Sequence, residues 1–473
     1  MMEIPCGMQE QFLEAKELIE SSNDIKIYTH TDCDGICSGA ILSIILDRLN
    51  KDYEIEFVNL DEIEDLDLDH KLTIFSDLGS GQGVDKNAKD GQKILILDHH
   101  PPLRDINYKN DKAYTYLEIN PMFYSIDGSY YVCGGGLCYF LAKTFGFKDL
   151  SWIGVLSAIG DMQNNKTGHF EGLNEIIQED AINEGLLKVT KNDLNIYGRS
   201  TRPLYVALSY FSDVKLPITN NQQEAKVVLE ELGVDEKHNR KTLSEVTEED
   251  KMEIKKFLSR MISKRVPPKY LKYVPKLIVG DAYTFLNEEE GSFLRDGSEF
   301  STAMNACGRN RKEAIGVDII KGDRLVALDA LEEVSKTHKY NLATSISKVA
   351  DNYHSEIIEL DNFQYFDCSD FDEDIASNII GTITGMVLGY CNWKKPILGF
   401  SKPKNNQIKV SLRCSKLLAY DGIHFGNMIR EIAKEVGGTG GGHAIACGAY
   451  IPNEKKSEFL DKFNRKLQGK IAN

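Results

Sequence analysis

Short apolar runs alternate with amphipathic stretches along the first 200 residues. Residues 9–22 place apolar side chains at helical spacing, whereas residues 72–76 and 94–97 are continuous apolar runs that are typical of buried strands. Strands that alternate with helices indicate a parallel, doubly wound α/β domain over about 1–200. The predicted helices lie at 9–22, about 36–50, 137–145 and 151–160, and the predicted strands at 24–29, 53–58, 72–76 and 94–97.

The pattern changes after residue 200. Two charged helical segments, 221–233 and 246–265, precede the Pro267-Pro268 break and predict a mainly helical insertion over 201–295. Residues 296–340 are predicted to return to the first domain and to continue into a long connecting helix from about 325. Residues 341–473 are predicted to form a smaller C-terminal α/β domain, with strands near 355–359, 363–367, 397–401 and 407–413.

Four acidic or histidine motifs directly follow apolar segments of the first domain. They are His30-Thr31-Asp32-Cys33-Asp34-Gly35, Asp77, Asp98-His99-His100, and Asp161 after the apolar helix. The carboxyl ends of neighbouring parallel strands converge on one crevice, so we expect these side chains to lie together. Carboxylates and imidazoles form the ligand set of Mn²⁺, Fe²⁺ or Zn²⁺, and of Mg²⁺ where carboxylates dominate.

The order of these motifs predicts a two-metal site. Alternation along the first motif would aim His30, Asp32 and Asp34 into one pocket, with the intervening side chains facing away. Asp77, central in the inferred strand order, is the expected bridge between two ions. Each motif alone also occurs in ordinary turns and on surfaces, but four in order at spacings that fit βαβ units favour the metal site.

The C-terminal domain has a glycine run over 437–442, followed by His443. We expect the run to precede a helix and to present backbone N–H groups to an anion, with His443 as a further donor. Ser411 and Arg413 lie two residues apart on the adjacent predicted strand, so both would face one side, where Arg413 can hold a phosphate. The alternative is a flexible hinge and an ordinary strand arginine. For Gly134-Gly135-Gly136, close helix packing is the preferred interpretation.

Charge is unevenly distributed along the chain, whose formal net charge is −16. Residues 391–473 hold 15 Lys and Arg against 6 Asp and Glu, a net +9, which leaves −25 for the remaining 390 residues. An acidic body with a basic C-terminal module suits a phosphate-rich ligand, although a solvated basic face is the alternative. The chain shows no membrane-spanning stretch and no secretory pattern, so we expect a cytoplasmic protein. Ten scattered Cys without Cys-x-x-Cys spacing argue against a structural zinc.

Together, the four motifs and the Gly-Gly-Gly-His of residues 440–443 resemble the DHH phosphoesterase superfamily. The middle segment, with the run from Glu299 to Arg309, resembles the insertion of archaeal RecJ-like nucleases. The resemblance implies two Mn²⁺ ions, with Mg²⁺ as the other choice. It places His30, Asp32 and Asp77 around one ion, and Asp34, Asp77, His99 and Asp161 around the other.

The resemblance also implies roles for the remaining candidates. Asp98 would orient the neighbouring ligands, and His100 would contact the scissile phosphate. The substrate-binding candidates are Ser411, Arg413, Gly440, Gly441, Gly442, His443, Asn305 and Arg309.

The first hypothesis is a metal-dependent exonuclease that degrades single-stranded DNA, RNA or both, with a role in DNA repair or replication. One alternative is a phosphodiesterase of short oligonucleotides or cyclic dinucleotides. The other is a replisome scaffold that binds the GINS complex. The 201–295 insertion favours the nuclease and the scaffold, because a dinucleotide hydrolase needs no such addition.

Overall fold

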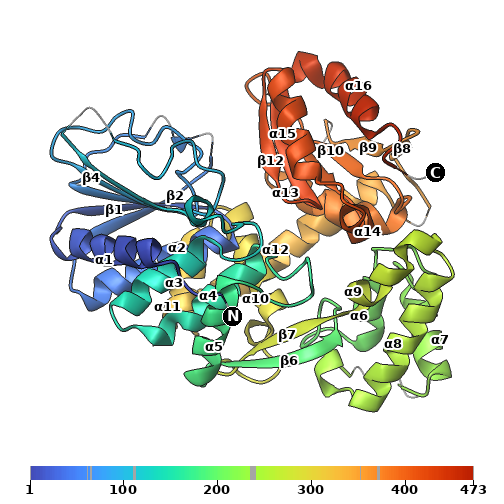
Figure 1. Ribbon diagram of the computed structural model, residues 1–473. Helices are drawn as coiled ribbons and strands as arrows, with labels where there is room; N and C mark the ends of the chain where they lie inside the picture. Colours follow the sequence, from blue (N-terminus) through green and yellow to red (C-terminus); the bar gives the residue numbers. More distant parts are fainter. Residues whose placement is uncertain are drawn as a thin grey trace. The chain divides into compact units, whose positions relative to one another are not determined.

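The computed structural model describes residues 2–60, 62–63, 66–109, 113–234, 241–351, 353–369 and 373–471. The chain forms two compact units, and each is assembled from two separate parts of the sequence (Figure 1). Met1–Asn192 and Gly280–Ser335 form the first unit, and Asp193–Val279 and Lys336–Asn473 form the second. The domain boundaries expected after residues 200, 295 and 340 stay a prediction.

The first unit is built on a five-stranded parallel sheet of order β2-β1-β3-β4-β5. This sheet confirms the predicted α/β class, and β3 is its central strand. The strands are β1 (Ile25–His30), β2 (Tyr53–Val58), β3 (Leu72–Ser76), β4 (Lys93–Leu97) and β5 (Thr115–Ile119).

The two faces of this sheet are covered differently. Alternate strand residues such as Ile74 and Leu95 enter the main core, which contains the helices of the unit. Residues between them, such as Phe75 and Ile96, pack with apolar side chains from the connections near 63–68 and 84–88. The helices are α1 (Cys6–Glu20), α2 (Cys33–Arg48), α3 (Gly134–Thr144), α4 (Ser151–Gly160), α5 (Leu173–Asn183), α10 (Gly297–Arg309) and α11 (Glu313–Lys321), with short 3₁₀ helices η2 (Pro121–Tyr124), η3 (Lys148–Leu150) and η6 (Phe293–Arg295).

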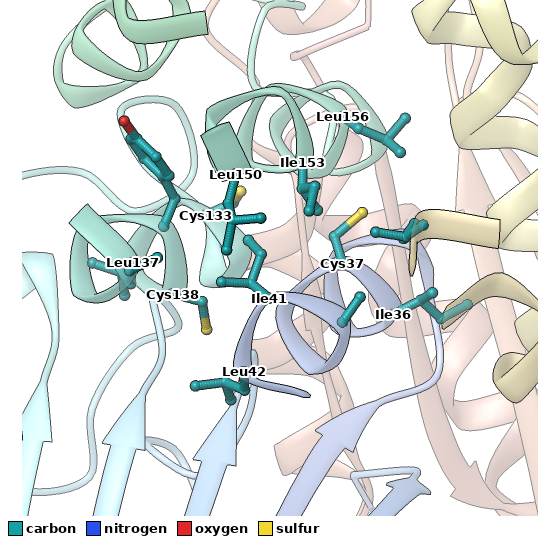
Figure 2. Packing of buried hydrophobic residues seen from close by; sticks show 14 of the residues in the cluster. Ile36, Cys37, Ile41, Leu42, Cys133, Leu137, Cys138, Leu150, Ile153 and Leu156 are labelled. Atoms are coloured by element: carbon teal, nitrogen blue, oxygen red, sulfur yellow. The ribbon is translucent and has the colours of Figure 1, made fainter. Parts of the chain in front are cut away.

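The cysteines lie mostly in the hydrophobic core. Nine of the ten are buried free thiols, and Cys6 is exposed. Cys37, Cys133 and Cys138 lie among the aliphatic side chains where α2, α3 and α4 pack together (Figure 2). Burial raises the pKa of these three thiols well above the usual range, so they stay protonated and act as small apolar residues.

The second unit combines a helical part and a mixed sheet. The sheet has six strands in the order β12-β13-β11-β10-β9-β8, with β9 and β10 parallel and the other neighbours antiparallel. Its strands are β8 (Ile358–Glu359), β9 (Gln364–Asp367), β10 (Ile397–Phe400), β11 (Gln407–Arg413), β12 (Thr439–Gly442) and β13 (Ala446–Pro452). Its helices are α13 (Glu373–Met386), α14 (Lys416–Tyr420), α15 (Phe425–Glu435) and α16 (Lys456–Leu467), with η7 (Val387–Tyr390) and η8 (Asn453–Lys455).

The helical part of this unit shares its core with the sheet part, because Trp393 and Leu417 belong to the same apolar cluster as Leu208, Ile254 and Leu277. Its helices are α6 (Leu204–Ser209), α7 (Gln222–Glu231), α8 (Glu248–Ser263) and α9 (Val274–Ile278), with η4 (Leu243–Glu245) and η5 (Pro268–Tyr273). The strands β6 (Leu187–Leu194) and β7 (Val279–Phe285) form a two-stranded sheet, and α12 (Val326–Val349) runs from the first unit into the second. Within the described ranges, no helix is long and apolar enough to cross a membrane.

Candidate metal centre

The carboxyl edge of the parallel sheet gathers the predicted ligands. His30 is the last residue of β1, Asp77 follows β3, and Asp98 follows β4. Asp77 has a φ of 57°, in the left-handed region that Asp tolerates better than most non-glycine residues. Its N–H donates to the Leu97 carbonyl at 2.9 Å, which ties this turn to the end of the neighbouring strand.

The structure brings the expected ligands into two groups that share Asp77. In the first group, His30 Nδ1 lies 3.1 Å from Asp32 Oδ2 and 3.5 Å from Asp77 Oδ2. In the second, His99 Nε2 lies 3.3 Å from Asp77 Oδ1 and 3.6 Å from Asp34 Oδ2. The two oxygens of Asp77 therefore face different groups, which is the arrangement that a bridging carboxylate requires.

Asp161 completes the second group. It follows α4, and its ligand oxygen lies within 4.8 Å of the ligand atoms of Asp34 and His99. A third cluster, whose ligand atoms also lie within 4.8 Å of one another, contains Asp77, Asp98, His99 and His100. All six expected metal ligands thus lie at this edge of the sheet.

The donor atoms fit a divalent cation. His99 Nδ1 donates to the Gly128 carbonyl at 2.7 Å, which leaves the lone pair of Nε2 directed at the carboxylates. Among the residues that the structure describes, His99 Nε2, His30 Nδ1 and Asp77 Oδ2 are buried and have no hydrogen-bond partner. Buried polar atoms without partners are costly, and a bound cation would satisfy all three at once.

The pKa shifts of the candidate ligands also favour a bound cation. Burial and the nearby Asp34 and Asp32 carboxylates hold the pKa of Asp77 well above its usual range. Burial opposes a charge on His99, but the Asp161 and Asp77 carboxylates outweigh it and raise the His99 pKa well above normal. His30 has a raised pKa as well, since the Asp32 carboxylate outweighs its burial. Binding of a cation by these side chains would therefore release protons.

Asp34 is anchored by the start of α3. Its Oδ2 accepts from the Gly134 N–H at 2.8 Å, and its Oδ1 accepts from the Gly135 N–H at 2.7 Å and from the Ser157 hydroxyl. A Cβ on Gly134 would lie 2.6 Å from the Cβ of Asp77, and one on Gly135 would lie 2.2 Å from Ser157 Oγ. The glycines pack closely, as expected, but they also hold a ligand, a role that the sequence interpretation missed.

The first motif departs from the alternation that the sequence predicts. α2 begins at Cys33, where an extended segment was expected, because the Asp32 side chain caps the helix by accepting from the Gly35 N–H at 3.1 Å. Asp32 and Asp34 therefore join different ligand groups. A Cβ on Gly35 would lie 2.0 Å from the His30 carbonyl oxygen, so the tight turn into α2 requires glycine.

Asp98 and His100 form a separate, adjoining pair. The fully buried Asp98 accepts through Oδ1 from the His99 N–H (2.8 Å) and from His100 Nδ1 (2.8 Å), and through Oδ2 from the Ser80 N–H (2.9 Å). Burial opposes ionisation of Asp98, but His100 outweighs it and keeps the Asp98 pKa well below its usual range. Asp98 thereby fixes the His100 ring and leaves its Nε2 open, and 44% of the His100 side chain is exposed.

Asn305 lies next to the centre through a contact that the sequence did not indicate. Its Oδ1 accepts from the Cys33 N–H at 3.1 Å, so it supports the backbone of the first motif. Three residues later in α10, a Cβ on Gly308 would lie 1.7 Å from the Thr31 carbonyl oxygen. Arg309 ends the same helix. Substrate contact by Asn305 and Arg309 stays a prediction.

The substrate-binding candidates of the second unit lie on two strands, except His443, which directly follows β12. Ser411 and Arg413 of β11 face α13, since a Cβ on Gly381 would lie 3.5 Å from Ser411 Oγ and 2.9 Å from Arg413 Nη2. Arg413 is half-buried, desolvation lowers its pKa, and its Nη1 donates to the Leu412 carbonyl at 2.8 Å. Glycines 440, 441 and 442 form β12, and β13 separates them from β11.

The expectation that the glycine run precedes a helix is wrong. β12 pairs with β13 from Thr439 to Gly442, and the His443 N–H donates to the Ala446 carbonyl at 2.9 Å as the chain turns back. The glycines are required by close packing instead. A Cβ on Gly440 would lie 2.9 Å from the Ala449 Cβ, and one on Gly426 of α15 would lie 1.9 Å from the Gly442 carbonyl oxygen.

Comparison with known proteins gives matches over most of the chain. The N-terminal domain of the DHH family matches residues 24–156, the DHH-CID domain matches 196–274, and the DHHA1 domain matches 361–469. The uncharacterized protein MJ0831 of Methanocaldococcus jannaschii is 30% identical over 446 residues, which cover 93% of this chain and 92% of that protein.

Two solved structures share the fold. CDC45 from Entamoeba histolytica has a TM-score of 0.61 and 15% identity, with 98% of this chain and 99% of that chain covered. RecJ from Thermus thermophilus, in complex with Mn²⁺, has a TM-score of 0.54 and 13% identity, with 99% of this chain and 55% of that chain covered.

Proposed function

The chain belongs to the DHH family, and we propose from this that its centre binds two Mn²⁺ ions and hydrolyses single-stranded DNA or RNA as an exonuclease. The observation that carries the proposal is the geometry of Asp77, whose two oxygens face His30 and His99 separately. Mn²⁺ is favoured over Mg²⁺ by the two imidazoles, and the RecJ structure with the same fold contains Mn²⁺.

The candidate residues would have different roles around a bound phosphodiester. The ions, when bound, supply a hydroxide near neutral pH and neutralise charge on the phosphate oxygens. His30, Asp32 and Asp77 would hold one ion, and Asp34, Asp77, His99 and Asp161 the other. His100, held by Asp98 through its Nδ1, would direct its Nε2 at the scissile phosphate and stabilise the charge that develops there.

The second unit would grip the strand. Arg413 is half-buried and forms no ion pair within the part of the chain that the structure describes, so a phosphate would supply the opposite charge. Ser411 lies on the same side of β11 as Arg413, and the side chains of both residues lie close to Gly381. Their placement on one face supports a phosphate subsite formed by β11 and α13.

The test is digestion of end-labelled DNA and RNA strands, with each end blocked in turn, in Mn²⁺ and in Mg²⁺. We expect mononucleotides released from one end of a single strand, and none from a duplex. Asp77→Ala should abolish cleavage and reduce the bound metal, whereas the exposed Asp69→Ala in the same unit should change neither. Turnover by folded Asp77→Ala at the wild-type rate would exclude the shared-carboxylate centre.

The same digestion distinguishes the two alternatives. Cleavage restricted to oligonucleotides of a few residues or to cyclic dinucleotides would identify the small-substrate phosphodiesterase. Absence of cleavage on every substrate, with binding of GINS proteins, would identify the replisome scaffold. The complete ligand set favours the enzyme, because a scaffold has no need for a shared Asp77 between two groups of buried ligands.

A further inference from the structure

A concentration of positive charge lies far along the chain from the metal ligands. Residues 254–280 contain eight Lys and Arg and no Asp or Glu, although the chain as a whole carries −16. They form the later part of α8, then η5 and α9, in the second unit. Seven of the eight are exposed: Lys256, Arg260, Lys264, Arg265, Lys269, Lys272 and Lys276.

Two tyrosine rings lie among these lysines. The Tyr273 and Tyr420 ring centroids are 5.4 Å apart, with an angle of 38° between the planes. Lys272 Nζ lies 4.7 Å from the centroid of Tyr273, and Lys276 Nζ lies 5.6 Å from that of Tyr420. We call Lys269, Lys272, Tyr273, Lys276 and Tyr420 the lysine–tyrosine surface.

The charge of this surface is only partly neutralised. Lys269 forms an ion pair with Asp421 at 2.6 Å. Across the part of the chain that the structure describes, Lys272 and Lys276 form no ion pair, and the rings beneath them carry no compensating charge. Both tyrosines pack against the apolar cluster of the helical part, and this packing fixes the position of their rings.

We propose that the lysine–tyrosine surface binds a single strand of nucleic acid at a site of its own, apart from the metal centre and from Arg413. Proteins that hold single strands without sequence preference combine lysines along the backbone with aromatic rings on which bases stack. Lys272 and Lys276 would contact phosphates, and the two tyrosines would stack with bases. A duplex hides its bases and would bind less tightly. The inference rests on the proposed function, since it names a second contact for the same substrate.

The test measures binding of the full chain to a fluorescent oligothymidine of about twenty nucleotides, with EDTA present so that nothing is cleaved. Lys272→Ala/Lys276→Ala is compared with Lys402→Ala/Lys404→Ala, two exposed lysines of the same unit that lie outside the surface. We expect binding roughly tenfold weaker for the first pair, and a salt dependence shallower by about 1.4 in the log–log slope, for two lost phosphate contacts. The control pair should match the wild type. Equal affinities and slopes in both pairs would overturn the proposal.

Stacking is tested separately by Tyr273→Leu, which keeps an apolar side chain against the helical core. We expect weaker binding with an unchanged salt slope, because stacking releases no counterions. Oligonucleotides with 5-iodouracil should photo-crosslink to the peptides that contain Tyr273 or Tyr420. Crosslinks confined to other peptides would overturn the site. A surface that serves an acidic protein instead would leave strand affinity unchanged in every variant, which also overturns it.

Hydrolysis of thymidine 5′-monophosphate p-nitrophenyl ester separates this proposal from the proposed function. The ester is too small to require a second strand contact, so the lysine double variant should cleave it at the wild-type rate. Lysine-dependent strand binding without any hydrolysis would leave the surface standing and remove the nuclease assignment. Hydrolysis together with strand binding that does not depend on the two lysines would support the nuclease assignment and overturn the lysine–tyrosine surface.

Discussion

Gln163 holds Asp161 in place from two positions further along the chain. Its Nε2 donates to Asp161 Oδ2 at 2.8 Å and also to the Gly128 carbonyl at 2.7 Å. The same carbonyl accepts from His99 Nδ1, so one buried amide connects two ligands of the second group. Asn174 donates to Gln163 Oε1 at 2.6 Å and fixes the amide orientation.

We predict that Gln163→Leu weakens Mn²⁺ binding by about 10–100-fold, the usual cost of losing a partner behind metal ligands. The substitution keeps the side-chain volume but removes the donor that orients Asp161. Titration calorimetry with Mn²⁺ measures the effect, and Gln178→Leu in the same unit serves as a control. An unchanged Mn²⁺ affinity in a folded variant would show that the Asp161 carboxylate keeps its orientation without Gln163.

The hydrogen bonds of Gln163 illustrate which parts of the metal centre could be predicted from the sequence and which could not. The strand-end motifs were visible because ligands of a parallel sheet must follow apolar runs, as Asp77 follows β3. Gln163 acts through the Gly128 carbonyl, a backbone atom that no sequence pattern marks. The support of the first motif by Asn305 is equally invisible, because 272 positions separate Asn305 from Cys33.

The local geometry was less predictable than the fold. An extended segment through Asp32 is also compatible with the sequence. The Asp32 carboxylate instead caps α2 by accepting from the Gly35 N–H, so the strand alternation ends at this residue. The glycines of β12 read as an anion-binding loop, yet pairing with β13 and packing under α15 decide their conformation. Tertiary contacts decide between a loop and a strand for these glycines, because a glycine-rich sequence is compatible with both.

His100→Ala should separate phosphate contact from metal binding. His100 donates to Asp98 and is partly exposed, so the variant should retain Mn²⁺ while the hydrolysis rate falls by about 10²–10³-fold. His99→Ala, in contrast, should lose bound metal. Metal content by mass spectrometry, together with kcat, distinguishes the two variants. Loss of metal in His100→Ala would mean that the roles of the two histidines are reversed.

The buried ion cluster of the second unit should make its stability depend on pH. Asp193 pairs with Arg199 at 2.6 Å and with Lys251 at 3.1 Å, and all three side chains are buried. Burial opposes ionisation of Asp193, but Arg199 outweighs it and lowers the Asp193 pKa. Because the folded pKa lies below the unfolded value of about 3.9, this stabilisation is present above that pH and is lost as the pH falls through the folded pKa.

Asp193→Asn should therefore lower the free energy of unfolding by about 3–5 kcal/mol at pH 7, since it removes the buried carboxylate that pairs with both Arg199 and Lys251. The deficit should shrink as the pH falls below about 4, where Asp193 of the wild type becomes protonated as well. Urea unfolding of both proteins at a series of pH values measures the difference. Asp461→Asn, at an exposed position of α16, is the control. A deficit that stays constant with pH would assign the loss to packing.

Arg413 should contribute to strand binding and leave the metal centre intact. Its side chain lies beside Gly381 in the second unit, whereas every candidate metal ligand lies in the first, so Arg413→Ala should keep the wild-type metal content. Affinity for a labelled single strand of about ten nucleotides should fall, with a salt slope shallower by about 0.7 for one lost phosphate contact. His443→Ala should weaken binding in the same direction. Mononucleotide esters should be affected less, because they lack the further phosphates that Arg413 would hold. Identical slopes for wild type and Arg413→Ala would mean that this arginine, packed beside Gly381 of α13, stabilises the domain and does not contact substrate.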